Sequence, residues 1–424
     1  MDNYYVDVII IGSGLAGLYS ALKIKKICPD MSFLVIEKDR LYGGRSYDYK
    51  FENSDVVTGA GIGRKKKDKL LLKLMKEFNI PIHTFETGHI YSDSFNGSCD
   101  VKSVFLNLKN KYINDNKNIK QKTHVTFKQY AKEILGEKAY AHFIECSGYS
   151  DYENADVYDT FYNYNFDDNY SKWEGFSVPW KVLVDKIVSS LGNSVRNNSE
   201  VTKIKKEEKY YEIVVKNNND MKKPKDNSTT TYYCEKIIIA TDIDALHHLI
   251  RDISPNPKLY NNIKGQSFLR MYAKFSKDSI PLLKEKIQGV LVVKGPIQKI
   301  IPMEPDKGIY MIVYSDNADA DFFKKYFKNN IKNRTALTKM FEKAINLENR
   351  LHIENIKDFY WKNGTHYYAP LTSEFSTRQE FIKKAQHPNS SILVVGEVIS
   401  LHQGWVEGAL ESVKSTVTKK WLHN

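Results

Sequence analysis

The chain has 424 residues, of which 42% are hydrophobic and 12% aromatic, and its formal net charge is +12. This length favours two domains, and the apolar content is enough for well-packed interiors. No run of about eighteen apolar residues occurs, so a transmembrane helix is not expected. The charge would attract anionic partners, but no nucleic-acid motif accompanies its densest runs, 64–67 and 222–225, so a solvated surface is the simpler interpretation.

The cysteines and the first residues of the chain predict the compartment in which the protein is found. Cys28, Cys99, Cys146 and Cys234 lack C-x-x-C spacing, which argues against a metal site or a disulfide framework and suits a reducing compartment. Met1 leads almost at once into an apolar run and leaves no room for a signal peptide. We therefore expect a soluble, cytoplasmic protein. The abundance of Lys, Asn, Ile and Tyr is typical of AT-rich genomes such as those of protists or large DNA viruses, and the viral case is compatible with virion packaging.

The first forty residues have the pattern of a dinucleotide-binding unit. The apolar run 6–11 leads into the three glycines of a G-x-G-x-x-G motif, Gly12, Gly14 and Gly17. A second apolar run, 33–36, ends in Glu37. A strand, a tight turn, a helix and a second strand that ends in an acid are the order that such a site needs. The helix N-terminus offers free N–H groups to phosphates, and Glu37 can accept hydrogen bonds from ribose hydroxyls.

The segment after Glu37 indicates which dinucleotide is bound. Gly43-Gly44-Arg45 follows the acid-bearing strand, so the chain can pass close to a phosphate or ring while Arg45 neutralises pyrophosphate charge. A plain nicotinamide dehydrogenase has no need of this second loop. Here the chain resembles the FAD-dependent amine oxidase family, which includes monoamine and polyamine oxidases and has the same Gly-Gly-Arg after its second strand.

The resemblance extends to the far end of the chain. The buried run Val394–Glu397 ends in Gly-Glu and precedes Gly404-Trp405-Val406. In the family such a strand and the following helix N-terminus cover the flavin, so the N–H groups of Trp405 and Val406 would face the flavin carbonyl where negative charge develops. No cysteine occurs in this loop, and we therefore expect non-covalent FAD.

Between these ends the resemblance implies further cofactor contacts from the Gly-rich loop 57–63, from Val201 and from Thr241, which ends a buried strand. The residues expected to contact FAD are Gly12, Ser13, Gly14, Leu15, Ala16, Gly17, Glu37, Lys38, Gly43, Gly44, Arg45, Gly59, Ala60, Gly61, Ile62, Val201, Thr241, Gly396, Glu397, Gly404, Trp405 and Val406.

We expect an α/β fold: a Rossmann-like FAD-binding domain of the p-hydroxybenzoate hydroxylase or amine oxidase type, with a discontinuous α+β substrate domain. The FAD-binding domain is expected over 1–80, 175–250 and 355–424, and the substrate domain over 81–174 and 251–354. Periodicity predicts helices over 70–78, 126–135, 138–146, 182–191, 322–326 and 337–347. It predicts strands over 201–204, 210–215, 232–240, 268–275, 289–293 and 308–314. The polar segment 217–230 is interpreted as an exposed hairpin loop.

The family's lysine near the flavin falls on Arg270 in this sequence. Arginine stays protonated and presents a planar fork of donors. It could supply positive charge toward oxygen, but it could not act as a tunable base. A surface arginine on a strand is the alternative interpretation.

The family also places two aromatic walls beside the flavin. The first falls on His366 in the stretch 361–370, or on Tyr367 or Tyr368 if the alignment shifts. A histidine can change charge near neutral pH, which would suit a polar substrate, whereas a packed histidine at a domain boundary is the alternative. The second wall falls on Trp405, an accepted variant in the family. The candidate catalytic residues are Arg270, His366, Tyr368 and Trp405, and no metal is expected.

These features predict oxidation of a small amine or polyamine by FAD, with oxygen as acceptor and an imine and hydrogen peroxide as products. The expected partners are the amine and oxygen, without specific nucleic acid or membrane, and a homodimer is compatible with this hypothesis. The alternative is an FAD-binding protein with little or no oxidase activity that serves a binding or structural role. A desaturase-like or protoporphyrinogen-oxidase-like relative would want an exposed apolar face, which the Tyr/Asn/Lys-rich middle of the chain does not offer.

Overall fold

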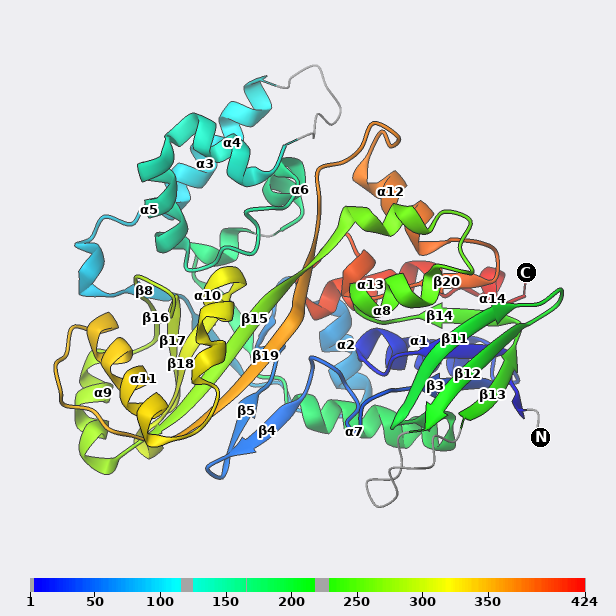
Figure 1. Cartoon of the computed structure of the whole chain (residues 1–424), viewed down its shortest axis with the longest axis horizontal. Coiled ribbons are helices and arrows are strands. Elements are labelled where there is room, and N and C mark those ends of the chain that lie inside the picture. Colours follow the sequence, from blue (N-terminus) through cyan, green and yellow to red (C-terminus); the bar gives the residue numbers. More distant parts are fainter. Residues whose placement is uncertain (1–3, 116–124, 165, 218–228, 424) are drawn as a thin grey trace.

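The computed structural model describes residues 4–115, 125–164, 166–217 and 229–423. Figure 1 shows two parts, each with its own sheet, joined by two long strands that cross the middle of the molecule. The predicted loop 217–230 falls almost entirely outside the described residues.

The first part is built on a five-stranded parallel sheet with the order β10-β3-β2-β14-β20. Its strands are Val195–Arg196, Phe33–Ile36, Val8–Ile11, Lys236–Ile239 and Ile392–Val394. Strands β2, β3 and β20, and β14 after Lys236, are continuously apolar because both faces of a parallel sheet are covered. The predicted Rossmann-like α/β class is confirmed.

Alternate side chains of β2 enter two different cores, as the period of a strand requires. Val8 and Ile10 enter the core shared with helices α1, α2, α7, α13 and α14. These helices span Leu15–Ile27, Lys69–Glu77, Trp180–Leu191, Val406–Thr416 and Lys419–His423. Ile9 and Ile11 enter the second core, which the sheet β1-β13-β12-β11 and helices α8 and α12 cover. These elements span Tyr4–Tyr5, Thr229–Cys234, Tyr211–Asn217, Ser199–Lys206, Ile243–Ile250 and Arg378–Gln386.

The second part is built on a six-stranded sheet with the order β19-β15-β18-β17-β16-β8. Its strands are Ile353–Tyr368, Ile263–Phe275, Ile309–Asp316, Lys299–Glu304, Val290–Val292 and His89–Tyr91. On one face Leu269 and Met271 join a core with helices α9 (Ile280–Lys286), α10 (Asn317–Phe322) and α11 (Ile331–Ala344). Phe268 and Arg270, one position away, therefore project from the other face.

A helical subregion with an aromatic core lies at the far end of this sheet (Figure 1). Its helices are α3 (Val101–Asp115), α4 (Phe127–Leu135), α5 (Glu137–Ser147) and α6 (Val157–Tyr162). Thr126 caps α4 through a reciprocal capping box with Gln129. The remaining small sheets are the hairpin of β4 (Asp48–Phe51) with β5 (Ser54–Val57), and β6 (Gly63–Arg64), β9 (Trp173–Phe176) and β7 (Thr84–Thr87). Short 3-10 turns complete the description, at Asp93–Phe95, Phe166–Asn169, Gly192–Ser194, Pro257–Asn262, Lys277–Ser279, Pro305–Lys307, Phe323–Tyr326 and Glu397–Ile399.

Strands β15 and β19 form one antiparallel ribbon that belongs to both parts. Their pairing runs from Ile263 opposite Tyr368 to Phe275 opposite Ile353. The first pair is buried in the second core of the parallel sheet, and the last pair is buried in the core of the six-stranded sheet. The ribbon thus starts in one core and ends in the other.

Two predicted elements differ from those observed. The predicted strand 232–240 is two strands, because β13 ends at Cys234 and β14 begins at Lys236 in a different sheet. The predicted helix 322–326 is the last residue of α10 followed by a 3-10 turn. In the first case the charged pair Glu235-Lys236 marks the point where the chain passes from one sheet to the other.

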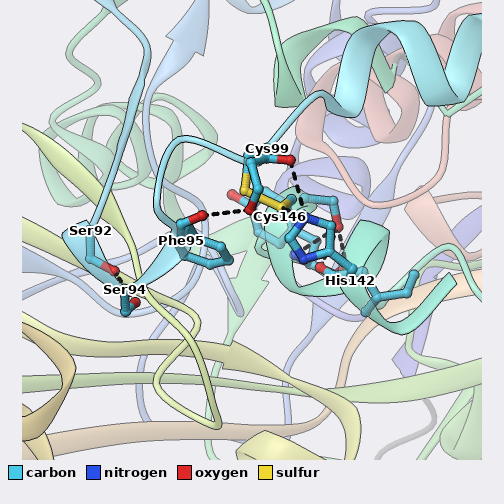
Figure 2. Close-up of a disulfide and its surroundings, with 10 residues drawn as sticks. Ser92, Ser94, Phe95, Cys99, His142 and Cys146 are labelled. Atoms are coloured by element: carbon cyan, nitrogen blue, oxygen red, sulfur yellow. Dashed lines mark hydrogen bonds between the residues drawn. A yellow bond between two sulfur atoms is a disulfide. The ribbon is translucent and has the colours of Figure 1, made fainter. Parts of the chain in front are cut away.

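The prediction that the cysteines form no disulfide is wrong for one pair. Cys99 and Cys146 are bonded, with their Cα atoms 5.5 Å apart (Figure 2). Sequence spacing did not reveal this pair because 47 positions separate the two residues. They meet because helices α3 and α5 pack on the same aromatic core. Cys28 and Cys234 are free and buried.

In the described part of the chain, no helix has the length and apolar character needed to cross a membrane.

Candidate functional site

A cavity of about 1200 Å³ extends from the carboxyl ends of the parallel strands to the free face of the six-stranded sheet. Ligands of open α/β sheets bind at this end of the strands. The sequence-predicted residues that line it are Gly12, Gly14, Leu15, Ala16, Glu37, Lys38, Gly43, Gly44, Arg45, Gly59, Ala60, Gly61, Ile62, Val201, Thr241, Arg270, Gly396, Glu397, Gly404, Trp405 and Val406. Four others lie behind its surface, namely Ser13, Gly17, His366 and Tyr368.

The three glycines of the first turn have different surroundings. Gly12 has φ +100°, and a Cβ atom there would lie 2.6 Å from the Ala240 carbonyl oxygen. A Cβ atom on Gly17 would overlap the Gly12 carbonyl, so this glycine allows helix α1 to pack on the turn. Gly14, the N-cap of α1, has no atom within 4 Å of such a Cβ and faces the cavity. Gly12 and Gly17 therefore serve the fold, whereas Gly14 keeps open the space where a phosphate would meet the helix N-terminus.

Glu37 lies at the end of β3, where the βαβ pattern predicts it. One of its carboxylate oxygens, Oε2, accepts hydrogen bonds of 2.8 Å from both the backbone N and the side-chain Oγ of Ser13. Oε1 accepts one of 3.0 Å from the Asp39 backbone N. The carboxylate is thus fixed at the cavity wall, and its remaining lone pairs suit the ribose hydroxyls of a dinucleotide.

The second glycine loop lies against the first. The Gly43 N–H donates a 3.0 Å hydrogen bond to the Ser13 carbonyl, and both Gly43 and Gly44 have positive φ. Arg45 then donates from Nη1 to the Gly364 carbonyl at 2.7 Å and to Glu397 at 2.9 Å. This arrangement fits a pyrophosphate that passes between two glycine loops and has a guanidinium close by.

Glu397 connects three segments that are distant in sequence. Its Oε1 accepts from the backbone N atoms of His366 at 2.9 Å and Gly404 at 2.7 Å. Its Oε2 accepts from Arg45 and, at 2.6 Å, from His366 Nδ1. Burial alone would raise the pKa of Glu397, but its interactions with His366 and Arg45 outweigh burial and hold that pKa well below its ordinary value. The carboxylate stays ionised and organises the loops around the cavity.

The structure places His366 and Tyr368 behind the cavity wall, which corrects the expectation that either residue forms an aromatic wall. The His366 ring bonds Glu397 through Nδ1, and its Nε2 accepts the Ile243 N–H at 3.2 Å. Tyr368 is 2% exposed and donates from Oη to the Ser400 carbonyl. Residues 361–365 of β19 line the cavity instead. His366 corresponds to the packed histidine that the sequence left as the alternative.

Two tryptophans and Arg270 surround the middle of the cavity. Trp405 donates from Nε1 to Asp68 at 2.8 Å, and Trp361 donates from Nε1 to the Thr58 carbonyl at 2.7 Å. Arg270 is 7% exposed, and its Nη2 would lie 3.6 Å from a Cβ atom on Gly61. A surface arginine is therefore excluded, because the guanidinium lies beside the Gly-rich loop 57–63, to which the resemblance assigns cofactor contacts.

Several cavity residues were missed by sequence reasoning, namely His89, Tyr149, Asp151, Asn169, Lys299, Tyr314 and Trp361. Most come from the second sheet and the helical subregion, whose sequences carry no motif. One signal was available, because Lys299 is a single charged residue within the apolar run 297–301. Trp361 lies in the stretch 361–370, to which the resemblance assigns the first aromatic wall.

Comparisons with known proteins agree with this geometry. Residues 10–78 match the family described as NAD(P)-binding Rossmann-like domain. The uncharacterized protein R188 of Acanthamoeba polyphaga mimivirus is 22% identical over 491 residues, covering 98% of this chain and 93% of that protein. A putrescine oxidase double mutant has a similar structure, with a TM-score of 0.73 and 14% identity over 100% of both chains. Wild-type putrescine oxidase bound to putrescine gives a TM-score of 0.72 and 14% identity over 98% of both chains. The chain therefore has the fold of these putrescine oxidase structures.

Proposed function

We propose that this chain is an FAD-dependent oxidoreductase that oxidises a small amine with oxygen to an imine and hydrogen peroxide. The observation that carries the proposal is the single cavity that joins the dinucleotide turn to Arg270 and the free face of the second sheet. A cofactor in the part of the cavity beside the dinucleotide turn and a substrate in the part beside the six-stranded sheet would meet at the Gly59–Gly61 loop, Trp361 and Trp405. The division into an FAD-binding domain and a substrate domain, with the boundaries given above, is part of the same proposal.

The residues that line the cavity beside the dinucleotide turn fit FAD. The N-terminus of α1 would face the pyrophosphate, Glu37 the ribose, and Gly404 and Trp405 the flavin edge. When bound, FAD would supply the two-electron acceptor that amine oxidation needs. No cysteine is among the described residues that line the cavity beside the dinucleotide turn, which supports non-covalent binding.

Arg270 is positioned to hold permanent positive charge at the junction. Its Nη2 donates to Tyr314 Oη at 3.3 Å, and its guanidinium carbon lies 4.3 Å from the centroid of that ring. A fixed cation in a water-poor site stabilises negative charge that develops on oxygen without reorganisation. Because arginine does not lose its proton at neutral pH, we assign it no role as a base.

Replacing Arg270 by methionine is therefore expected to slow the reaction of the reduced protein with oxygen about 100-fold, the size of effect seen when one preorganised charge-stabilising group is removed. Reduction by the amine should change far less. Stopped-flow absorbance of the two half-reactions measures both rates. Arg270→Lys retains the charge and should recover most of the oxygen reaction. Equal slowing of both half-reactions would show that Arg270 positions the amine instead.

The test of the function is anaerobic titration of the FAD-loaded protein with amines, amino acids and polyamines. Reduction is measured as the loss of flavin absorbance at about 450 nm. Bleaching by one class supports the oxidoreductase and identifies the class. If every amine fails with a fully loaded protein, the alternative FAD-binding role without amine oxidation is favoured. That alternative draws on one specific feature, the arginine at the position where the resembled family has lysine.

A further inference from the structure

A row of three side chains crosses the free face of the six-stranded sheet. Arg270 on β15 pairs with Tyr314 on β18, and Tyr314 pairs with Lys299 on β17. Residues that are directly opposite on neighbouring strands project from the same face of a sheet. All three line the cavity. The cavity thus has one cation at the proposed junction with FAD and a second cation two strands farther from it.

Lys299 is buried without the partner that a buried cation needs. It is 0% exposed, and no described residue accepts a hydrogen bond from its Nζ atom. Its stem runs against Gly148, where a Cβ atom would lie 2.6 Å from the lysine Cε. The Nζ atom lies 3.0 Å from the centroid of the Tyr149 ring. Burial lowers the pKa of Lys299 well below its ordinary value, against the opposing effect of Asp151 and Asp316.

A second buried hydrogen-bond donor on the cavity wall also lacks a partner in the described part of the chain. Asn169 is 5% exposed and lines the cavity, and its Nδ2 also lacks a partner among the described residues. Burial, together with the charge of Lys299, lowers the pKa of His89 to about 3, so its ring is neutral at neutral pH. Two carboxylates act on Lys299: Asp316, which already accepts hydrogen bonds from Ser150 and Gln298, and Asp151, which accepts a 2.5 Å hydrogen bond from Tyr164 Oη. Burial raises the pKa of Asp151 to about 7, which weakens it as an anchor for a cation.

We propose that the amine substrate carries a carboxylate group, which Lys299 and Asn169 bind at the far end of the cavity while the amine lies near Arg270. This inference rests on the proposed function and narrows its substrate class. A carboxylate brings the charge and the lone pairs that both unsatisfied donors lack. The second ammonium of a diamine would instead meet the Lys299 amine, so the polyamine expected from the resemblance is disfavoured.

The experiment compares four six-carbon amines that differ in the second group and in its distance from the amine. Aminohexanoate carries a terminal carboxylate, norleucine an α-carboxylate, diaminohexane a second amine, and hexylamine nothing. We expect aminohexanoate to have a kcat/KM at least about tenfold above that of hexylamine and of diaminohexane, since a charge-assisted hydrogen bond contributes this much or more. Norleucine should show no such gain, because its carboxylate lies beside the amine and cannot reach Lys299, two strands away from Arg270.

Lys299→Met removes the amine and keeps an unbranched side chain of similar length. We expect KM for aminohexanoate to rise about 30-fold, far more than KM for hexylamine. The variant should fold, because it removes an unsatisfied polar group from a buried site. Lys274→Met is the matched control, since Lys274 lies on the same sheet and its Nζ atom bonds the exposed Lys307 carbonyl.

A second measurement does not depend on turnover. Calorimetric titration of the FAD-loaded protein with hexanoate should give a dissociation constant about 30-fold weaker for Lys299→Met than for wild type, whereas uncharged hexanamide should bind both proteins alike. Hexylamine oxidation with no preference for aminohexanoate would overturn this inference and leave the proposed function intact. Equal hexanoate affinity in both proteins would overturn it as well. Lys299-dependent hexanoate binding without oxidation of any amine would support the carboxylate site and count against the proposed function.

Discussion

Gly14→Val is expected to abolish FAD binding while the protein remains folded. A Cβ atom at Gly14 has nothing within 4 Å in the protein, and its backbone φ of −61° and ψ of 170° suit any residue. The added side chain would instead occupy the space beside the helix N-terminus where the pyrophosphate is proposed to bind. We expect FAD affinity to fall more than about 100-fold, which corresponds to about 2.7 kcal/mol. Unfolding stability should fall by only about 1 kcal/mol, the usual cost of a branched apolar residue at an N-cap.

Two further glycines make this result specific. Gly17→Val would force a side chain into the Gly12 carbonyl and should prevent folding. Gly289→Val, at another open position that lines the far end of the cavity, should leave FAD binding unchanged. FAD content after heat release and the thermal midpoint by circular dichroism measure the two properties separately. A yellow, fully loaded Gly14→Val protein would refute the proposed cofactor position.

Glu397→Gln is expected to cost about 3 kcal/mol of unfolding free energy, because it breaks a buried charged network by changing one partner. The carboxylate accepts four hydrogen bonds, and an amide presents only one acceptor oxygen. The amide nitrogen would then face either the Arg45 and His366 side chains or two backbone N–H groups. Urea unfolding of the apoprotein measures the loss, and weakened FAD binding should accompany it because Arg45 and Gly404 lose their common anchor.

The chain supplies a matched control for this substitution. Glu411 also bonds a histidine, with its Oε2 2.7 Å from His402 Nδ1, but both side chains are about two-fifths exposed, at 41% and 36%. Exposed pairs of this kind contribute about 1 kcal/mol or less, so Glu411→Gln should change stability little. Similar losses for the two variants would mean that Glu397 is less important to the fold than its contacts suggest.

The first part of the fold could be predicted from the sequence because its signals are local. The apolar run, the three glycines and Glu37 are all within the first forty residues, and each has a direct physical role in one turn. The Glu397 network could not be predicted, since its partners Arg45, His366 and Gly404 come from three separate segments. Lys299 was missed for the same reason, because only the pairing of β17 with β18 brings it to the cavity.

Residues that lie side by side in one sequence motif can differ in whether they reach the cavity. His366 and Thr365 are neighbours on β19, yet only Thr365 lines the cavity, because Glu397 and the Ile243 N–H hold the His366 ring behind the wall. An alignment that is correct to within one residue therefore cannot decide which side chain meets a ligand. The disulfide Cys99–Cys146 shows the same limit, since contact between α3 and α5 is a property of their common aromatic core.

The ribbon of β15 and β19 restricts how a substrate can enter. Hinge-bending enzymes open by rotating two rigid bodies about a few flexible residues. Here a hydrogen-bonded pair of strands, with a bulge between Gln266 and Phe268, is anchored at Ile263 and Tyr368 in one core and at Phe275 and Ile353 in the other. Rotation of one body against the other would bend or break that ladder and disturb both interiors. Traffic into and out of the cavity should therefore depend on local movements of side chains and loops at its mouth, while the distance between the two sheets stays nearly constant through turnover.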